Sequence, residues 1–389
     1  MMIAHNRPGT FHGSPRRRQQ AFTLVELMVA MTIGLLLISA LLAVFLNVSR
    51  TNREMAKTNI LIENGRFAIQ LLQNDLIHAG YWGELDFIGA DDIPPAVPAP
   101  TGIPAACLAV ASWTAQYKAN LLSIPVQGFV NGTDLSTCGV TGVLGTSEVL
   151  LVRHANTCVR GAADCDEGAD TGPHIQISTC RQDTDPDPSP YVLQPVGAGT
   201  PSPATFPLRK KACPASATLT AVDAPLRKFV SHIYYLAMSG TPSQPTLMRI
   251  SMENGAYAKP QPFIEGIEQF RVEYGIDENG KDGLPIDLTT TPPNLGDGSA
   301  DRFITTAQLA AADATAACNV AGSRCFLLAN TVAVKIHVLA RNLEPTPGYT
   351  DNKTYQLGAT TVAADGNYKR HVFSSTIRLV NPSGRRETP

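Results

Sequence analysis

The sequence is poor in charge and has no excess of either sign. Charged residues make up 16% of the 389 residues, and 31 basic residues nearly balance 33 acidic ones, for a formal net charge of -2. This low charge content, together with 44% hydrophobic residues, excludes charge-driven disorder over most of the chain. The balance of signs offers no global attraction for a phosphate backbone, so we expect no nucleic-acid partner.

Proline is absent from residues 16–93, although the chain has 29 prolines and 27 of them lie in residues 94–389. Proline removes a backbone donor and breaks helix interiors. The chain therefore divides into an N-terminal stretch that can be helical throughout and a proline-punctuated remainder that is not mainly helical.

Sequence patterns of common catalytic sites are missing. There is no G-x-S-x-G, no H-E-x-x-H, no P-loop and no C-x-x-C pair of the kind that holds zinc. The segment from Asp277 to Asp282 resembles a calcium loop but lacks the residue order of an EF-hand, which favours a hairpin turn. His337 and His371 lie in strand patterns, where solvated positions are expected. We expect no enzymatic activity and no cofactor.

Acidic residues are absent from residues 1–21, which contain Arg7 and Arg16–Arg18. The segment that follows has a single charge, Glu26, and its uncharged part, Leu27–Leu46, is 20 residues long. As a helix this part measures about 30 Å, enough to cross a bilayer. The basic cluster predicts a cytoplasmic N-terminus and translocation of the rest of the chain across the membrane.

Three interpretations of this segment compete. A secretory signal peptide would have an apolar core of roughly 7–15 residues and an A-x-A-like cleavage site, and this core is longer. A plain signal anchor leaves Glu26 unexplained, because a carboxylate in the bilayer costs about 2–3.5 kcal/mol and needs a partner. The third interpretation is the class III signal of type IV pilins and pseudopilins.

The run Arg16–Leu27, RRRQQAFTLVEL, resembles that signal. In this family, prepilin peptidase cuts a basic leader before a Phe, the new amine is methylated, and the fifth mature residue is Glu. The resemblance implies cleavage between Ala21 and Phe22, N-methylation of Phe22, and an assembly role for Glu26. Ala21 stands where the family usually has Gly. The family account pairs the glutamate with the N-terminal amine of a neighbouring pilin.

The helical pattern continues beyond the apolar segment as far as Gly80, a plausible stop signal. Apolar residues recur at helical spacing on one side of it, at Leu61, Ala68, Leu72, Leu76 and Ala79. Polar residues fill the other sides, which predicts an amphipathic half-helix laid on a globular core.

Period-two alternation of apolar and polar residues predicts strands in the remainder of the chain. The predicted strands are Glu148–Arg153, Phe229–Ala237, Thr246–Ser251, Glu268–Ile276, Thr331–Arg341 and a last strand through Phe373 and Ile377. Alternation on one face indicates antiparallel sheet with one solvated side. Long loops are expected at Asp91–Ala106, Gly161–Pro203 and Asp277–Ala300.

All eight cysteines follow the apolar segment, on the side predicted to be translocated. An even count there indicates disulfides in an oxidising periplasm, and eight cysteines allow 105 pairings, so the connectivity stays open. The two seven-residue spacings, Cys158/Cys165 and Cys318/Cys325, are the preferred local loops. The disulfide candidates are Cys107, Cys138, Cys158, Cys165, Cys180, Cys213, Cys318 and Cys325.

Residues 66–83, 266–283 and 368–386 look like segments of the PilW family of minor pilins. The resemblance implies an α+β, pilin-like fold, in which a long N-terminal transmembrane and amphipathic helix packs on a C-terminal antiparallel β-sheet domain with long loops. The expected parts are a cleaved basic leader at 1–21, a transmembrane half-helix at 22–48, an amphipathic half-helix at 49–80 and a disulfide-containing β-rich domain at 81–389.

The resemblance also implies a function. A minor pilin is inserted in the inner membrane, processed by prepilin peptidase and built into a type IV pilus at the cell surface, where it helps to prime assembly near the tip. The implied partners are other minor pilins, the major pilin, the peptidase and inner-membrane lipid. Two alternatives stay open: a J-type minor pseudopilin of a type II secretion system, and a membrane-tethered adhesin or ligand-binding domain whose long loops bind.

Overall fold

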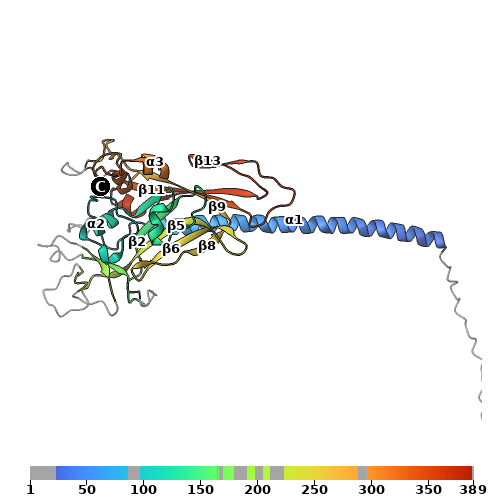
Figure 1. Cartoon of the computed structure of the whole chain (residues 1–389), viewed down its shortest axis with the longest axis horizontal. Helices are drawn as coiled ribbons and strands as arrows, with labels where there is room; N and C mark the ends of the chain where they lie inside the picture. The colour runs from blue at the N-terminus through green and yellow to red at the C-terminus, as the bar shows by residue number, and fades with distance from the viewer. Residues whose placement is uncertain are drawn as a thin grey trace, which may run out of the picture. The chain divides into compact units, whose positions relative to one another are not determined.

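In the computed structural model the chain forms a long N-terminal helix followed by antiparallel sheets (Figure 1). The structure describes residues 23–85, 97–163, 165, 170–178, 191–197, 205–210, 223–287, 294 and 296–387. The chain divides between Ala56 and Lys57 into a helical unit and a globular unit. The predicted α+β class, with a long N-terminal helix packed on an antiparallel β-sheet domain, is confirmed.

Helix α1 runs from Leu24 to His78 without interruption, as the absence of proline predicts. It ends before Gly80, whose φ of +72° is a left-handed conformation that glycine adopts without steric cost. In the globular unit, the predicted apolar stripe from Leu61 to Ala79 is buried, with each of its five residues at most 3% exposed. Tertiary packing therefore stabilises this half of the helix.

The other helices are short: α2 (Ala115–Ser123), α3 (Thr306–Ala311), α4 (Arg324–Ala329) and α5 (Val380–Gly384), with 3-10 turns at Val110–Ser112 and Thr133–Cys138. The first nine strands are β1 (Val126–Phe129), β2 (Val149–Ala155), β3 (Pro173–Ile177), β4 (Tyr191–Pro195), β5 (Leu226–Ser239), β6 (Gln244–Glu253), β7 (Ala256–Tyr257), β8 (Gln261–Glu265) and β9 (Ile267–Ile276). The remaining strands are β10 (Arg302–Thr305), β11 (Thr331–Arg341), β12 (Thr354–Leu357), β13 (Thr360–Ala363) and β14 (Arg370–Arg378).

Within the described residues the strands form three antiparallel sheets. An eight-stranded sheet has the order β1-β2-β5-β3-β4, with β6 also on β5 and with β7 and β8 on β6. Strand β5 accommodates both neighbours on one edge because its 14 residues pair with β3 through 226–228 and with β6 through 232–239. The second sheet has the order β10-β9-β11-β14, and β12 with β13 forms a hairpin.

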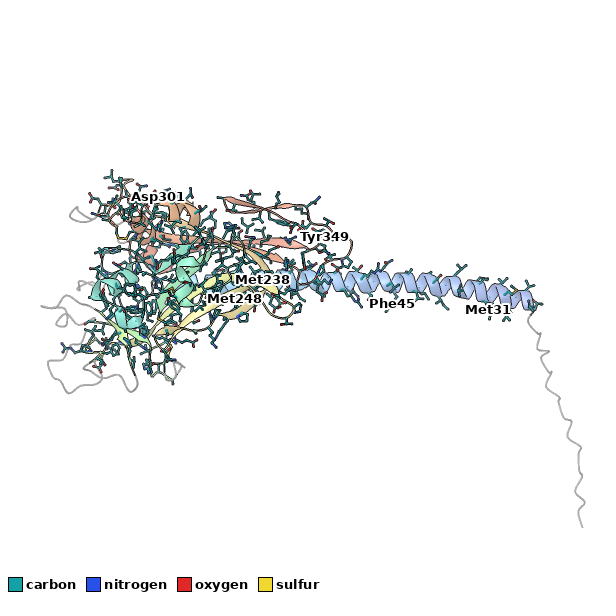
Figure 2. All side chains as sticks on the ribbon, viewed as in Figure 1. Met31, Phe45, Met238, Met248, Asp301 and Tyr349 are labelled. Atoms are coloured by element: carbon teal, nitrogen blue, oxygen red, sulfur yellow. A yellow bond between two sulfur atoms is a disulfide. The ribbon has the colours of Figure 1, made fainter. Side chains whose placement is uncertain are left out.

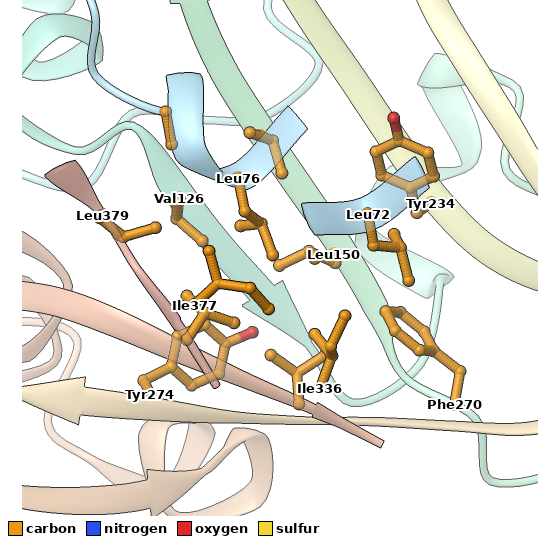
Figure 3. Close-up of a cluster of buried hydrophobic side chains, with 14 of the residues drawn as sticks. Leu72, Leu76, Val126, Leu150, Tyr234, Phe270, Tyr274, Ile336, Ile377 and Leu379 are labelled. Carbon is orange, nitrogen blue, oxygen red and sulfur yellow. The ribbon is translucent and has the colours of Figure 1, made fainter. Parts of the chain in front are cut away.

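The largest hydrophobic cluster joins the C-terminal half of α1 to both large sheets. Figure 3 shows Leu72 and Leu76 of α1 together with Leu150 and Tyr234 of the eight-stranded sheet and Ile336 of the four-stranded sheet. All five side chains are at most 1% exposed. Apolar burial contributes roughly 25 cal/mol per Å² of surface removed from water, so this cluster is the main cohesive contact between helix and sheets.

The six predicted strands are all present, but the prediction of a loop over Gly161–Pro203 is wrong in part. The segment contains β3 and β4, which pair with each other and attach to β5. Strand β3 cannot be recognised from alternation of buried apolar and exposed polar residues, because its polar residues are buried as well. The Gln176 side chain donates to the carbonyl of Ala224 and accepts from the amide of Leu208, both at 3.0 Å, so it is satisfied inside the fold.

The expectation that His337 is solvated is also wrong, whereas His371 is exposed as expected. The His337 side chain lies within 2.7 Å of the Ser374 hydroxyl and 3.7 Å of Glu273. The β12–β13 hairpin contacts the same place, since the amide of Ala359 donates to Glu273. The outer face of the four-stranded sheet is therefore covered at this position, which alternation along β11 does not reveal.

The structure contains disulfides between Cys107 and Cys138, between Cys158 and Cys165, and between Cys318 and Cys325. Both seven-residue spacings are thus bridged, and the pairing of Cys107 with Cys138 is one that the sequence left open. Cys180 and Cys213 lie outside the described residues.

Loss of the Cys107–Cys138 bridge is expected to destabilise the protein more than loss of Cys318–Cys325. The chain-entropy relation gives about 3.7 kcal/mol for a 31-residue separation and about 2.5 kcal/mol for a 7-residue one. The test compares urea unfolding of the two double Cys→Ser variants, after non-reducing peptide mapping of the wild type. Equal midpoints, or the reverse order, would contradict the expectation.

Candidate functional site

The N-terminal half of α1 is an apolar helix with no burial inside its own unit. An 18-residue window has a mean hydropathy of 2.7 and is 0% buried. Met31 and Phe45, labelled in Figure 2, are each 68% exposed. A helix that is apolar on every side needs lipid or other helices around it. Among the described residues, α1 is the helix long and apolar enough to cross a membrane.

Glu26 lies in the first turn of α1 and forms a capping box with Thr23. One carboxylate oxygen accepts from the Thr23 amide at 3.0 Å and from its hydroxyl at 2.9 Å, and the Glu26 amide donates to that hydroxyl at 3.2 Å. These reciprocal bonds satisfy amides that have no partner within the helix, and the negative charge stands at the positive end of the helix dipole. Ala21 and Phe22, the predicted cleavage residues, lie outside the described residues.

The role of Thr23 was not predicted, although the signal is present in the sequence. Thr23-x-x-Glu26 directly before an apolar run is the sequence signature of a capping box. The Glu26 side chain therefore offers two separate properties. Its negative charge can pair with a positive group of a partner, and its carboxylate oxygen caps its own helix.

A second constellation lies where α1 meets the eight-stranded sheet, and sequence analysis did not predict it. Asp75 of α1 lies between His154 of β2 and His232 of β5. Asp75 Oδ1 is 3.0 Å from His154 Nε2 and 3.0 Å from His232 Nδ1, whose distance to Oδ2 is 3.1 Å. The sheet brings the histidines together because His232 pairs with Val152, two residues before His154, so both side chains lie on one face.

The cluster is shielded from water, with side-chain exposures of 9% for Asp75, 12% for His154 and 17% for His232. Burial by itself raises the pKa of the Asp75 carboxyl, but the charge of His232 and the hydrogen bonds from both histidines outweigh it and hold that pKa well below its usual range. Burial lowers the pKa of His154, but the hydrogen bond and charge of Asp75 outweigh burial and raise that pKa above its ordinary value. The site therefore holds an ionised carboxylate that attracts positive charge.

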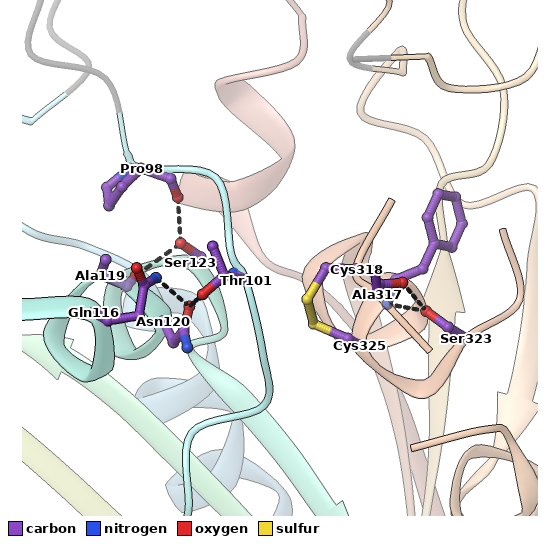
Figure 4. The surroundings of a disulfide bond; sticks show 11 residues. Pro98, Thr101, Gln116, Ala119, Asn120, Ser123, Ala317, Cys318, Ser323 and Cys325 are labelled. Atoms are coloured by element: carbon purple, nitrogen blue, oxygen red, sulfur yellow. Dashed lines mark hydrogen bonds between the residues drawn. A yellow bond between two sulfur atoms is a disulfide. The ribbon is translucent and has the colours of Figure 1, made fainter. Parts of the chain in front are cut away.

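A cavity of about 880 Å³ lies at the end of α1, lined by Gly80–Gly83, Val97–Thr101 and the C-terminal segments Val380–Pro382 and Gly384–Arg386. Figure 4 shows two groups of residues at this cavity, with Pro98, Thr101 and Ser123 on one side and the Cys318–Cys325 disulfide on the other. Its two arginines already bind the fold: Arg385 donates to the carbonyl of Gly80, and Arg386 to Asp277 and Asn330. The lining thus gives no specific indication of a charged ligand.

The Asp277–Asp282 segment forms a turn rather than a set of carboxylates converging on one point. Asn279 and Pro285 form an isolated bridge, and the Gly280 amide donates to the carbonyl of Leu284 at 2.8 Å. The Asp277 carboxylate accepts from the amide of Gly298 at 2.8 Å and lies 3.3 Å from Arg386. This arrangement uses the carboxylate to hold the loop, as expected of a hairpin-like turn.

The exposed apolar helix with its glutamate in the first turn defines a pilin-like protein, and the comparison with family models supports this class. Residues 16–42 match the Prokaryotic N-terminal methylation motif. Residues 233–381, from β5 to the start of α5, match PilW, described as Type IV Pilus-assembly protein W. Residues 233–381 are thus similar to the PilW type IV pilus-assembly domain, and residues 16–42 carry a prepilin methylation motif. Neither the curated proteins nor the solved structures yield a significant match.

Proposed function

We propose that this chain is a minor pilin of a type IV pilus. It is inserted in the inner membrane through residues 22–48, with residues 1–21 in the cytoplasm and the domain at 81–389 in the periplasm. Prepilin peptidase cuts between Ala21 and Phe22, and Phe22 is methylated. The mature chain joins other minor pilins, helps to prime assembly near the tip, and is carried to the cell surface with the major pilin.

The observation that carries this proposal is the combination of the methylation motif with an apolar helix that is not buried within its own unit. The basic residues before the helix and the absence of acidic residues there support the proposed orientation. The apolar surface of α1 is the part of the chain that needs other helices once it leaves lipid. The sheet domain contributes a rigid body, into whose core the second half of α1 is packed.

The match to PilW favours the pilus over a type II secretion pseudopilus, although both use a helix of this kind. The cavity beside the C-terminus is the feature of the structure that a ligand-binding or adhesive role would use. Its arginines are already engaged by the fold, so we keep the assembly role as the principal proposal.

Mass spectrometry of the membrane-purified protein is expected to show processing at Phe22. The mature chain should have 368 residues, the 389 of the full chain without its first 21, and should carry a methyl group on the Phe22 amine. The control is the same gene expressed in a strain without prepilin peptidase, where the leader should remain. A chain that still begins at Met1 or Met2 in a peptidase-positive strain would rule out the class III signal.

A further inference from the structure

We propose that Asp75, His154 and His232 form a binding site for one divalent transition-metal ion of the zinc type. The three side chains come from one helix and two strands, and their ligand atoms all lie within 4.8 Å of one another. The proposal concerns the stability of the helix–sheet contact and does not depend on the proposed function.

The hydrogen bonds of His154 carry the first step of the argument. Its Nδ1 is 2.8 Å from the carbonyl oxygen of Ala155, which only accepts, so Nδ1 holds the proton. In a neutral imidazole the opposite atom, Nε2, then presents a lone pair, and it lies 3.0 Å from Asp75 Oδ1, which also presents lone pairs. Two acceptors at this distance need a positive centre between them, either an added proton or a cation.

The surroundings of the cluster match those of metal-binding histidines. Such histidines usually donate their second ring nitrogen to a carbonyl or carboxylate, which fixes the ring for coordination. His154 makes this bond to Ala155.

The spacing of the ligand atoms suits a small ion. In a tetrahedral zinc site with bonds of about 2.0–2.1 Å, neighbouring ligand atoms are roughly 3.3–3.4 Å apart. Here Asp75 Oδ1 is 3.0 Å from each histidine nitrogen. The two Asp75–histidine distances need to open by only a few tenths of an ångström, and because all three ligand atoms lie within 4.8 Å of one another, rotation of the imidazoles brings them around one ion, with water in the fourth position.

The ligand set also selects the type of ion. Two imidazoles and one carboxylate are typical ligands of zinc and neighbouring transition metals, whereas magnesium and calcium prefer oxygen-only sites. Because Asp75 is separated from His154 by 79 residues and from His232 by 157, a bound ion connects α1 directly to β2 and β5. The ion would hold α1 against the eight-stranded sheet.

The test uses the full chain in detergent, with a purification tag free of histidine and without reductant, so that the disulfides stay closed. The protein is stripped with EDTA, loaded with Zn²⁺, dialysed, and analysed for bound zinc and for its thermal midpoint. We expect one Zn²⁺ per chain, a midpoint raised by Zn²⁺, and no such response to Mg²⁺. His154→Gln and His232→Gln should each weaken zinc binding by more than about 100-fold.

His371→Gln is the matched control, because His371 is an exposed histidine on the edge strand β14 and should leave zinc binding unchanged. A Co²⁺ titration of the wild-type chain provides a readout that needs no variant, since the visible spectrum of bound Co²⁺ reports a low-coordinate nitrogen and oxygen site. Wild-type protein that retains no more zinc than the His154→Gln/His232→Gln double variant, and gives no such spectrum, would overturn the proposal and leave a proton-mediated ion pair.

Discussion

Replacing Glu26 by alanine is expected to reduce incorporation into pili by roughly tenfold or more, while membrane insertion and leader cleavage continue. A carboxylate in the bilayer costs about 2–3.5 kcal/mol, and the N-terminal amine of a neighbouring subunit would offset that cost only in the assembled state. Loss of the pair removes a driving force for assembly, and each 1.4 kcal/mol corresponds to a factor of ten. Insertion should be unaffected or improved, because a membrane-buried charge disappears.

The capping box shows how to separate the charge of Glu26 from its hydrogen bonds. Glu26→Gln keeps an oxygen that can accept from the Thr23 amide but loses the charge, and a capping box accepts Gln as well as Glu. We expect Gln to be nearly as damaging as Ala. Thr23→Val removes the hydroxyl from the same box and should cost only about 1 kcal/mol of helix capping, with a small effect on assembly.

The measurement is immunoblotting of membrane and sheared-surface fractions for the wild type and the three variants at matched expression. Recovery of partner minor pilins from the membrane is measured in parallel. Wild-type incorporation of Glu26→Gln together with poor incorporation of Glu26→Ala would mean that capping, not charge, is the role of this residue. If Glu26→Ala and Glu26→Gln both enter pili at the wild-type level, Glu26 has no role in assembly and the plain signal-anchor interpretation is favoured.

Leu72→Ala is expected to destabilise the globular unit by about 2.7–5 kcal/mol, the range for leucine truncation in a close-packed core. Leu72 is 0% exposed and belongs to the cluster that joins α1 to both large sheets. The cavity left behind lies between elements that are far apart in sequence, so the surroundings can relax only in part. A loss of this size is a large share of the stability of an ordinary domain.

Urea unfolding followed by tryptophan fluorescence measures this effect selectively, because both tryptophans, Trp82 and Trp113, lie in the globular unit. Ile60→Ala is the control, since Ile60 is on the same helix but 45% exposed, and it should change stability by no more than about 0.5 kcal/mol. Equal losses for the two variants would show that the stripe on α1 does not carry the helix–sheet contact.

Helix α1 shows how far local sequence information reaches. The missing prolines, the 3.6-residue stripe and the stop at Gly80 each concern neighbours along the chain, and the helix from Leu24 to His78 agrees with all three. The methylation motif and the capping box are also local patterns, formed by residues close together in the sequence. The strongly alternating strands, such as β9 and β11, are likewise evident from period two alone.

The tertiary structure decided what no local pattern contains. Periodicity tells which side chains share a face of the sheet but not what covers that face. His337 lies beside Glu273 and Ser374 and is buried because the β12–β13 hairpin covers this part of the sheet. Strand order in the sheet is not chain order, since β5 lies between β2 and β3, and this placement brings His154 and His232 to Asp75. The Cys107–Cys138 disulfide likewise joins segments that only the fold brings together. Sequence alone determined the long apolar helix and the prepilin methylation motif, because both are encoded by residues close together in the chain. The buried Asp75 cluster and the Cys107–Cys138 disulfide depend on contacts between distant segments.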